Sequence, residues 1–143
     1  MGGDARPGGA LRPREAADFE GLWRLDRRIV QAEGPDARFH GEAEWRREGV
    51  RLLYSEAGIL EMPGHPPMQA TRSYLWEPDL TVRFTDGRVF HRVPARGGRT
   101  AHRCAPDLYE VEYDFALWPE FRVLWRVTGP RKDYTMTSLY RRA

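Results

Sequence analysis

The sequence has little of what disulfide-rich, secreted or membrane-spanning proteins require. It contains a single cysteine, Cys104, so no disulfide can form within the chain. Its longest apolar runs, such as Leu52-Leu53-Tyr54, are far shorter than the roughly 20 residues of a membrane-spanning helix. The first residues include no apolar stretch of the kind found in secretory signals. We therefore expect a cytoplasmic protein with no membrane partner.

The chain also lacks a block of like charge. Of its 23 basic residues only Lys132 is a lysine, and 21 acidic residues leave a net charge of +2. The arginines are scattered along the chain instead of forming a basic arm, which argues against nucleic acid as a partner. A homodimer is left open by the sequence.

What the chain does contain is enough material for one core. It has 143 residues, of which 41% are hydrophobic and 12% aromatic. This length and composition predict a single domain over residues 13–143, because two cores would each be too small to be stable. Residues 1–12 are rich in Gly, Pro and Arg and are predicted as a flexible tail. Pro13 and the helix-forming residues up to Glu20 predict a short lid or plug helix at most.

From Gly21 onward, apolar and polar residues alternate with the period of two that is typical of strands. Hairpin signals such as Asp86-Gly87 separate the segments, and Pro94–Thr100 is predicted as an exposed loop. With no helical crossovers, this pattern predicts an all-β, up-and-down antiparallel β-barrel of about 8–10 strands, since closure removes unpaired edges. The expected strands are Gly21–Val30, Phe39–Arg46, Val50–Leu60, Met68–Trp76, Leu80–Phe84, Arg88–Val93, Leu108–Trp118, Phe121–Thr128 and Tyr134–Arg141.

The start of the first strand carries a known motif. Gly21-Leu22-Trp23 follows the short helix, and Arg131 stands near the start of the last strand. This arrangement resembles the calycin superfamily of lipocalins and fatty-acid-binding proteins, in which the tryptophan packs across one barrel end, often beneath an arginine from the last strand. The resemblance implies that Arg131 caps Trp23.

A wider pattern over residues 19–141 resembles a family of small, mostly bacterial, calycin-like proteins that form a domain of unknown function. The resemblance implies the barrel fold and transfers no activity. The chain lacks the signal peptide and disulfide pair of true lipocalins, so an extracellular carrier role is not expected. The motifs that carry the resemblance are Phe19-x-Gly21-x-Trp23, the Asp86-Gly87 hairpin, His102-x-Cys104-x-x-Asp107-x-Tyr109 and Gly129-Pro-Arg-Lys-Asp-Tyr134.

Polar residues on the predicted inner face suggest a pocket. A buried guanidinium without a carboxylate partner costs several kcal/mol, so Arg27 and Arg72 have two readings. They pair with Glu56 or reach solvent at a barrel mouth, or they hold an anionic head group together with tyrosine hydroxyls such as that of Tyr74. The predicted inner residues are Arg27, Glu56, Arg72, Tyr74, Tyr109, Tyr113, Trp125, Tyr134 and Ser138.

A second group of side chains is predicted at the barrel rim. Arg131 and Lys132 lie in the turn before the last strand, and we expect them to face His102 and form a site for a phosphate or carboxylate. Cys104 is expected to be a half-buried thiol at the end of a loop. No metal site is predicted, because His91, His102, Cys104 and Asp107 do not have the paired short spacings of zinc sites.

The leading prediction is an intracellular barrel that binds a small amphipathic or aromatic anion. Arg27, Arg72 and Tyr74 would contact the head group, and Trp23, Trp125 and Tyr113 would surround the apolar body. The sequence identifies no cofactor. Two alternatives stay open: a barrel enzyme that uses Glu56 with Arg72 and Tyr74, or His102 with Asp107, in acid–base chemistry, and a haem or metal carrier that uses His91 or His102.

Overall fold

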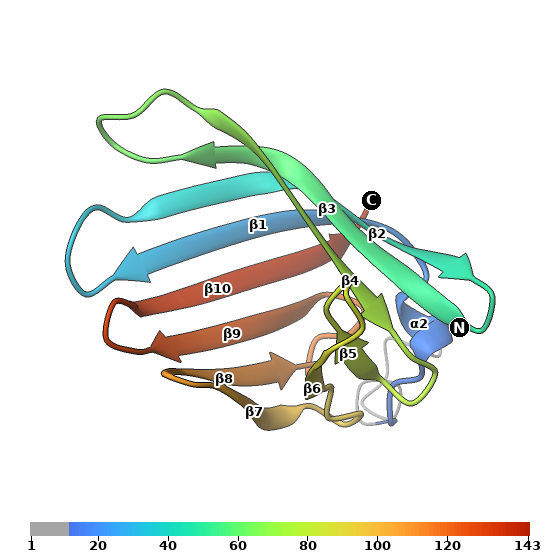
Figure 1. Cartoon of the computed structure of the whole chain (residues 1–143). Coiled ribbons are helices and arrows are strands. Elements are labelled where there is room, and N and C mark those ends of the chain that lie inside the picture. The colour runs from blue at the N-terminus through green and yellow to red at the C-terminus, as the bar shows by residue number, and fades with distance from the viewer. Residues whose placement is uncertain (1–11) are drawn as a thin grey trace.

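The computed structural model describes residues 12–143, so the predicted tail lies outside the described residues except for Arg12. One short helix, α2 (Ala16–Phe19), precedes ten antiparallel strands that follow one another around a single sheet and curl it into a nearly closed barrel (Figure 1). Within residues 12–143, no helix is long and apolar enough to cross a membrane. The strands are β1 (Gly21–Gln31), β2 (Ala37–Glu48), β3 (Arg51–Glu61), β4 (Met68–Trp76), β5 (Thr81–Arg83), β6 (Val89–Arg92), β7 (Gly98–Cys104), β8 (Asp107–Asp114), β9 (Phe121–Thr128) and β10 (Asp133–Arg142).

The predicted fold class is confirmed, and β4 and β9 have the predicted bounds. Two predictions were wrong. The segment Pro94–Thr100 is not a loop throughout, because β7 begins at Gly98. Strand β8 ends at Asp114, so the predicted strand to Trp118 was too long. Strand β7 was missed because it is an edge strand with little buried on either face. Trp118 lies in a turn after β8, where the centre of its ring is 5.2 Å from that of Phe19.

One end of the barrel is plugged by α2. Phe19 is fully buried, and Trp23 donates a hydrogen bond from Nε1 to the Phe19 carbonyl oxygen at 2.8 Å. Packing of so many rings at 5–6 Å gives offset and edge-to-face contacts that stabilise beyond simple burial. The predicted plug helix is therefore confirmed. We call this region the plugged end; its aromatic residues are Phe19, Trp23, Trp45, Trp76, Trp118 and Phe121.

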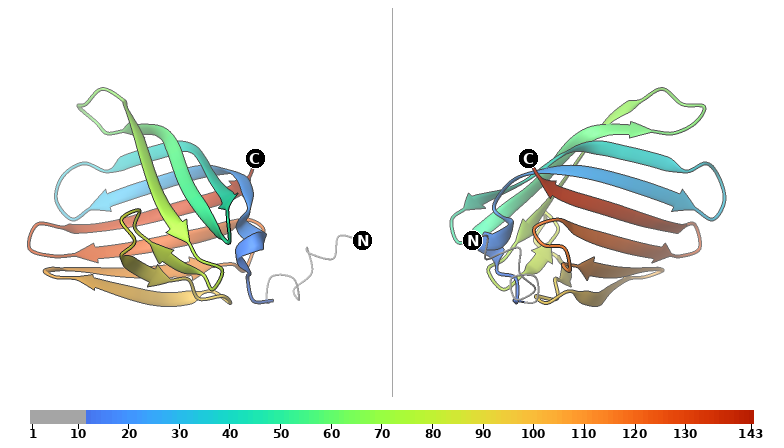
Figure 2. Two further views of the ribbon diagram at one scale, coloured as in Figure 1. Left: turned by 45° about the vertical axis from the view of Figure 1, so that its right-hand side comes forward. Right: turned by 180° about the vertical axis from the view of Figure 1, so that it is seen from behind.

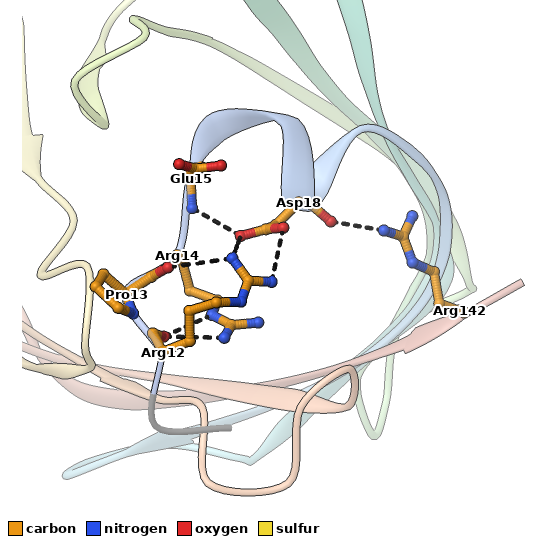
Figure 3. A network of polar contacts seen from close by, with 6 residues as sticks. All are labelled: Arg12, Pro13, Arg14, Glu15, Asp18 and Arg142. Atoms are coloured by element: carbon orange, nitrogen blue, oxygen red, sulfur yellow. Dashed lines mark hydrogen bonds and ion pairs between the residues drawn. The ribbon is translucent and has the colours of Figure 1, made fainter. Parts of the chain in front are cut away.

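An arginine does cover Trp23, but it is Arg142 and not Arg131. The Arg142 guanidinium lies 4.0 Å above the Trp23 ring and donates hydrogen bonds to the Asp18 and Glu20 carbonyl oxygens at 2.6 and 2.8 Å. Figure 3 shows Arg142 reaching the helix from the end of β10. In the same view, the Asp18 carboxylate accepts hydrogen bonds from the Glu15 amide and from Arg12. Arg131 is excluded because it lies in the β9–β10 turn, at the other end of both strands.

The sheet bends where two glycines face each other. Gly41 of β2 pairs with Gly58 of β3, and a Cβ on Gly41 would lie 2.1 Å from the Ala57 carbonyl oxygen. A Cβ on Gly58 would lie 2.3 Å from the His40 carbonyl oxygen, so neither position accepts a side chain without movement of the backbone. Glycine at such a position allows a sheet to turn a sharp corner. The β3–β4 hairpin extends away from the rest of the barrel (Figure 2).

The opposite side of the barrel is left incomplete. Strand β4 pairs with β3 along its whole length but with β5 only at Leu75 and Trp76. Strands β6 and β7 touch, yet they are the two ends of the hydrogen-bonded order of strands. Between β4 and the wall formed by β7, β8 and β9, no strand pairing closes the described part of the barrel. We call this region the open end.

Candidate functional site

A cavity in the barrel interior opens toward the open end. Its lining includes Arg27 of β1, Glu56 of β3, and Arg72 and Tyr74 of β4. The space between atoms is about 440 Å³ when the part open to solvent is included, but the centre of a water-sized sphere can move through only about 30 Å³. The smaller volume decides what fits inside, since ~10–15 Å³ of such space holds one water molecule. A larger ligand would contact the mouth of the cavity unless side chains move.

The deepest charged groups of the cavity are bonded to each other. Arg27 donates from its two Nη atoms to the two oxygens of Glu56 at 2.5 and 3.0 Å, and from Nε to Ser138 Oγ at 2.8 Å. Tyr54 donates to Glu56 at 2.5 Å, and its hydroxyl also bonds that of Tyr140 at 2.8 Å. Both charged side chains are buried, with 7% and 4% of their surfaces exposed. Of the two readings of Arg27, the structure therefore shows the internal pair.

This network fixes the charge states of its members. Burial alone would raise the pKa of Glu56, but the hydrogen bonds and charge of Arg27 outweigh burial and leave that pKa below its ordinary value. Burial likewise works against the charge of Arg27, and the bond to Glu56 reverses the effect so that its pKa is raised. Burial raises the pKa of Tyr140 to about 12, so its hydroxyl keeps its proton. The pair contributes no net charge to the cavity.

Arg72 is the cation of the cavity that has no carboxylate partner. It faces Glu56 across the β3–β4 ladder, but both Glu56 oxygens are occupied by Arg27. Among residues 12–143 the Arg72 guanidinium makes no ion pair, and it lies over the Trp125 ring at 5.6 Å from the ring centre. Its side chain is exposed to solvent at the mouth. The cavity therefore carries one positive charge in excess, at its entrance.

Aromatic rings surround Arg72 at the open end. The Phe90 ring lies at the centre of the group, 5.7 Å from Tyr74 and 5.3 Å from Trp125. Tyr74 and Trp125 are only half-buried, whereas the rings at the plugged end are buried except for that of Trp118. We call this group the open-end cluster; its members are Tyr74, Phe84, Phe90, His102, Tyr109 and Trp125.

A buried histidine also lines the cavity. His91 Nε2 lies 2.8 Å from the Tyr113 hydroxyl, and its Nδ1 is buried without a hydrogen-bond partner among the described residues. Burial, assisted by the nearby His102, lowers the pKa of His91 to about 4, so its ring is neutral at pH 7. A buried nitrogen left unpaired costs about 1–3 kcal/mol, so a bound polar atom at Nδ1 would be favourable. The sequence suggests His91 only as a haem or metal ligand or as a core residue, and not as a hydrogen-bonding group of the cavity.

The predicted rim residues separate into two groups. Lys132 Nζ bonds Asp107 Oδ2 and the Tyr109 hydroxyl, each at 3.0 Å, and these bonds raise the pKa of Lys132. Tyr134 lies near them, half-buried on the inner face of β10. Arg131 is exposed in the turn and does not line the cavity. The predicted anion site formed by Arg131 and Lys132 opposite His102 is thus not assembled, because Lys132 is already bonded to Asp107.

Of the two catalytic groupings considered from the sequence, the first, Glu56 with Arg72 and Tyr74, lines one cavity, and the second does not. Glu56 is ionised and bonded to Arg27, which does not suit a proton donor. Within the described residues no hydrogen bond joins His102 to Asp107, and His102 packs its ring 5.4 Å from Phe90. Cys104 is exposed, not half-buried as expected. In the same part of the chain, no group of three or more His, Cys, Asp and Glu residues is placed to hold a metal ion.

Comparison with known proteins identifies the family. The sequence model of a family of unknown function, DUF6314, matches residues 19–142, which is nearly the whole barrel. The chain belongs to this family, and the resemblance to a domain of unknown function is confirmed. A search of the curated proteins gives no match.

Proposed function

We propose that this DUF6314 barrel binds a small anion with an aromatic or amphipathic body, at the open end. The observation that carries the proposal is Arg72, an inward-facing cation with no carboxylate partner among residues 12–143. Because Arg27 is neutralised by Glu56, the head group is assigned to Arg72 alone and not to both arginines. The planar guanidinium can hold a carboxylate or phosphate through two parallel hydrogen bonds.

The open-end cluster supports an apolar or aromatic body for this anion. Trp125 already stacks beneath the Arg72 guanidinium, and Tyr74 and Tyr109 are half-buried, so a ring or short chain placed there would cover surface that water now contacts. The free space in the cavity is small, which favours a body that rests on these rings over one that enters deeply. His91 Nδ1 offers one hydrogen bond to a polar atom that does reach the interior.

A carrier role also agrees with the barrel architecture. A plugged end with a tryptophan covered by an arginine, and an opposite end that is open, is what the calycin-like resemblance leads us to expect of a binding barrel. We extend the proposal to a cytoplasmic protein, on the single cysteine that is exposed as a free thiol.

The test is a thermal-shift and native mass-spectrometry panel of small aromatic and aliphatic carboxylates and phosphates. A ligand that binds the folded state raises the unfolding temperature by an amount that grows with its concentration over Kd. We expect a shift and a bound mass for the wild type that disappear in Arg72→Gln. Arg24→Gln is the matched control, since Arg24 is an exposed arginine on the outer face of β1.

Two results would refute the proposal. One is the absence of a shift and of a bound mass across the whole panel. The other is a shift that Arg72→Gln retains in full, because binding would then not depend on the unpaired cation.

A further inference from the structure

Two thirds of strand β4 presents an edge that no other strand of residues 12–143 covers. Residues 68–73 pair with β3 on one side, and β5 joins the other side only at Leu75 and Trp76. Figure 1 shows this part of β4 in the hairpin arm that leaves the barrel, away from β7 and β8. Unpaired backbone N–H and C=O groups along a strand are a template for another strand. The edge contains no proline after Pro67 and no bulge in its pairing with β3.

The register identifies which backbone groups face outward along this edge. Glu77 donates its amide to the Thr81 carbonyl oxygen at 2.8 Å, so residue 77 points its backbone toward β5. In an antiparallel ladder every second residue points the same way. The amides and carbonyls of Gln69, Thr71 and Ser73 therefore face the free edge.

The outer face beside this edge carries no charged side chain over residues 53–59 of β3 and 69–75 of β4; charges return only at Arg51 and Glu61, the two ends of β3. The outward residues of β3 and β4 lie opposite each other in four pairs, all uncharged, although 31% of the chain is charged and eight residues would on average carry two or three charges. Arg72, the one charge between residues 68 and 73, points to the inner face. The four pairs are Leu53–Leu75, Ser55–Ser73, Ala57–Thr71 and Ile59–Gln69.

We propose that two copies of this chain pair through their β4 edges, antiparallel, about a two-fold axis at Thr71. Thr71 then faces Thr71 of the partner subunit, and Gln69 faces Ser73 of the partner subunit, with backbone hydrogen bonds at each pair. Threonine pairs across strands are favourable, and Arg72 faces Ala70 of the partner subunit, so no like charges meet. The uncharged outer face becomes continuous over four strands.

Comparison with the second free edge, strand β7, shows why we expect two copies to join through β4. Strand β7 is also an edge, and an antiparallel self-pairing centred on Ala101 would bring Arg99 opposite Arg103 of the partner subunit. Like charges directly opposite are destabilising. In this register arginines oppose self-pairing of β7, as charged residues do on many natural edges, whereas the pairing of β4 about Thr71 brings no like charges together. The dimer does not depend on ligand binding at the open end.

Sedimentation velocity from low micromolar to near-millimolar concentration tests the proposal. We expect the wild type to be a dimer at high concentration, and the amides of Gln69, Thr71 and Ser73 to exchange more slowly with deuterium as the dimer forms. Thr71→Pro removes the central amide, which faces the edge and not β3, so the fold is kept. Thr71→Arg places two like charges on the axis. Both variants should be monomers, and Thr71→Val, which keeps the amide, should dimerise like the wild type.

A wild type that stays monomeric over the whole range would overturn the proposal. So would dimers of undiminished stability in both Thr71→Pro and Thr71→Arg, which would assign the contact to another surface. Thr71→Arg keeps the test decisive if the proline variant fails to fold.

Discussion

Two groups of aromatic side chains occupy opposite ends of this barrel, and they differ in what covers them. At the plugged end, Phe19 and Trp23 have no exposed surface, since α2 and Arg142 lie over them. At the open end, Tyr74, Tyr109 and Trp125 are half-buried around Arg72, a cation with no carboxylate partner in the described part of the chain. Aromatic content therefore does not identify a site by itself. The two ends differ in whether other parts of the chain bury the rings and pair with the charges.

The largest expected effect is on stability at the plugged end. Trp23→Ala removes a fully buried ring and the bond to the Phe19 carbonyl, and should lower the free energy of unfolding by about 3–5 kcal/mol. Trp125→Ala, at the open end, should cost clearly less and should instead weaken anion binding. Urea denaturation with the thermal-shift panel checks both. Equal losses of stability in the two variants would remove the distinction between the ends.

Next in size is the buried ion pair that separates the two ends. Glu56→Gln leaves the Arg27 charge buried without a counter-charge and should destabilise the fold by about 3 kcal/mol at pH 7. Because the pKa of Glu56 is lowered in the folded state, the stabilising effect of the pair is complete above the unfolded pKa and is lost as the pH falls through the folded pKa. The gap between variant and wild type should therefore narrow in acid. Glu61→Gln, at an exposed carboxylate, is the control.

His91 should make the stability of the fold depend on pH in a higher pH range than Glu56 does. Its folded pKa of about 4 lies below the ordinary 6.5, so between these values the unfolded chain binds a proton that the folded chain does not. Stability should fall by about 1–3 kcal/mol as the pH drops from 6.5 to 4. Denaturation of His91→Phe across this range should show a shallower decline. An identical pH profile for the two proteins would place the titration elsewhere.

The smallest effect concerns the cap over Trp23. Arg142→Met removes the cation above the ring and two hydrogen bonds to carbonyl oxygens of the α2 segment, and should cost about 1–2 kcal/mol. Arg131→Met, in the exposed turn, should change stability by less than about 0.5 kcal/mol. Melting temperatures measured side by side decide between them. A larger loss of stability in Arg131→Met than in Arg142→Met would indicate that Arg131 covers Trp23, as the calycin motif implied.

Most strands of the fold follow from alternation in the sequence, as the predicted bounds of β4 and β9 show. Strand β7 could not be found in this way, because an edge strand that buries little on either face carries no apolar alternation. The end of the predicted strand Leu108–Trp118 was wrong for the opposite reason. An apolar residue after a strand, such as Trp118, can pack into the core from a turn as well as from the strand itself.

The site was predicted only in part. Inner-face alternation brought Arg27, Glu56 and Arg72 to one cavity, but which arginine would take the carboxylate depends on the stagger between β1, β3 and β4. His91 falls within the predicted strand Arg88–Val93, yet its unpaired nitrogen follows from packing that no local pattern encodes. Arg142 was missed because two arginines end β10, and only the register shows that the second one reaches Trp23.

The Gly41–Gly58 pair leaves no room for a side chain between β2 and β3, and neither glycine lines the cavity. Because Gly41 and Gly58 face each other without side chains, the sheet can bend sharply between them. The angle of this bend determines how far the β3–β4 hairpin lies from the opposite wall of the barrel. Replacement of either glycine would alter the angle, and the same rings would frame a wider or narrower entrance.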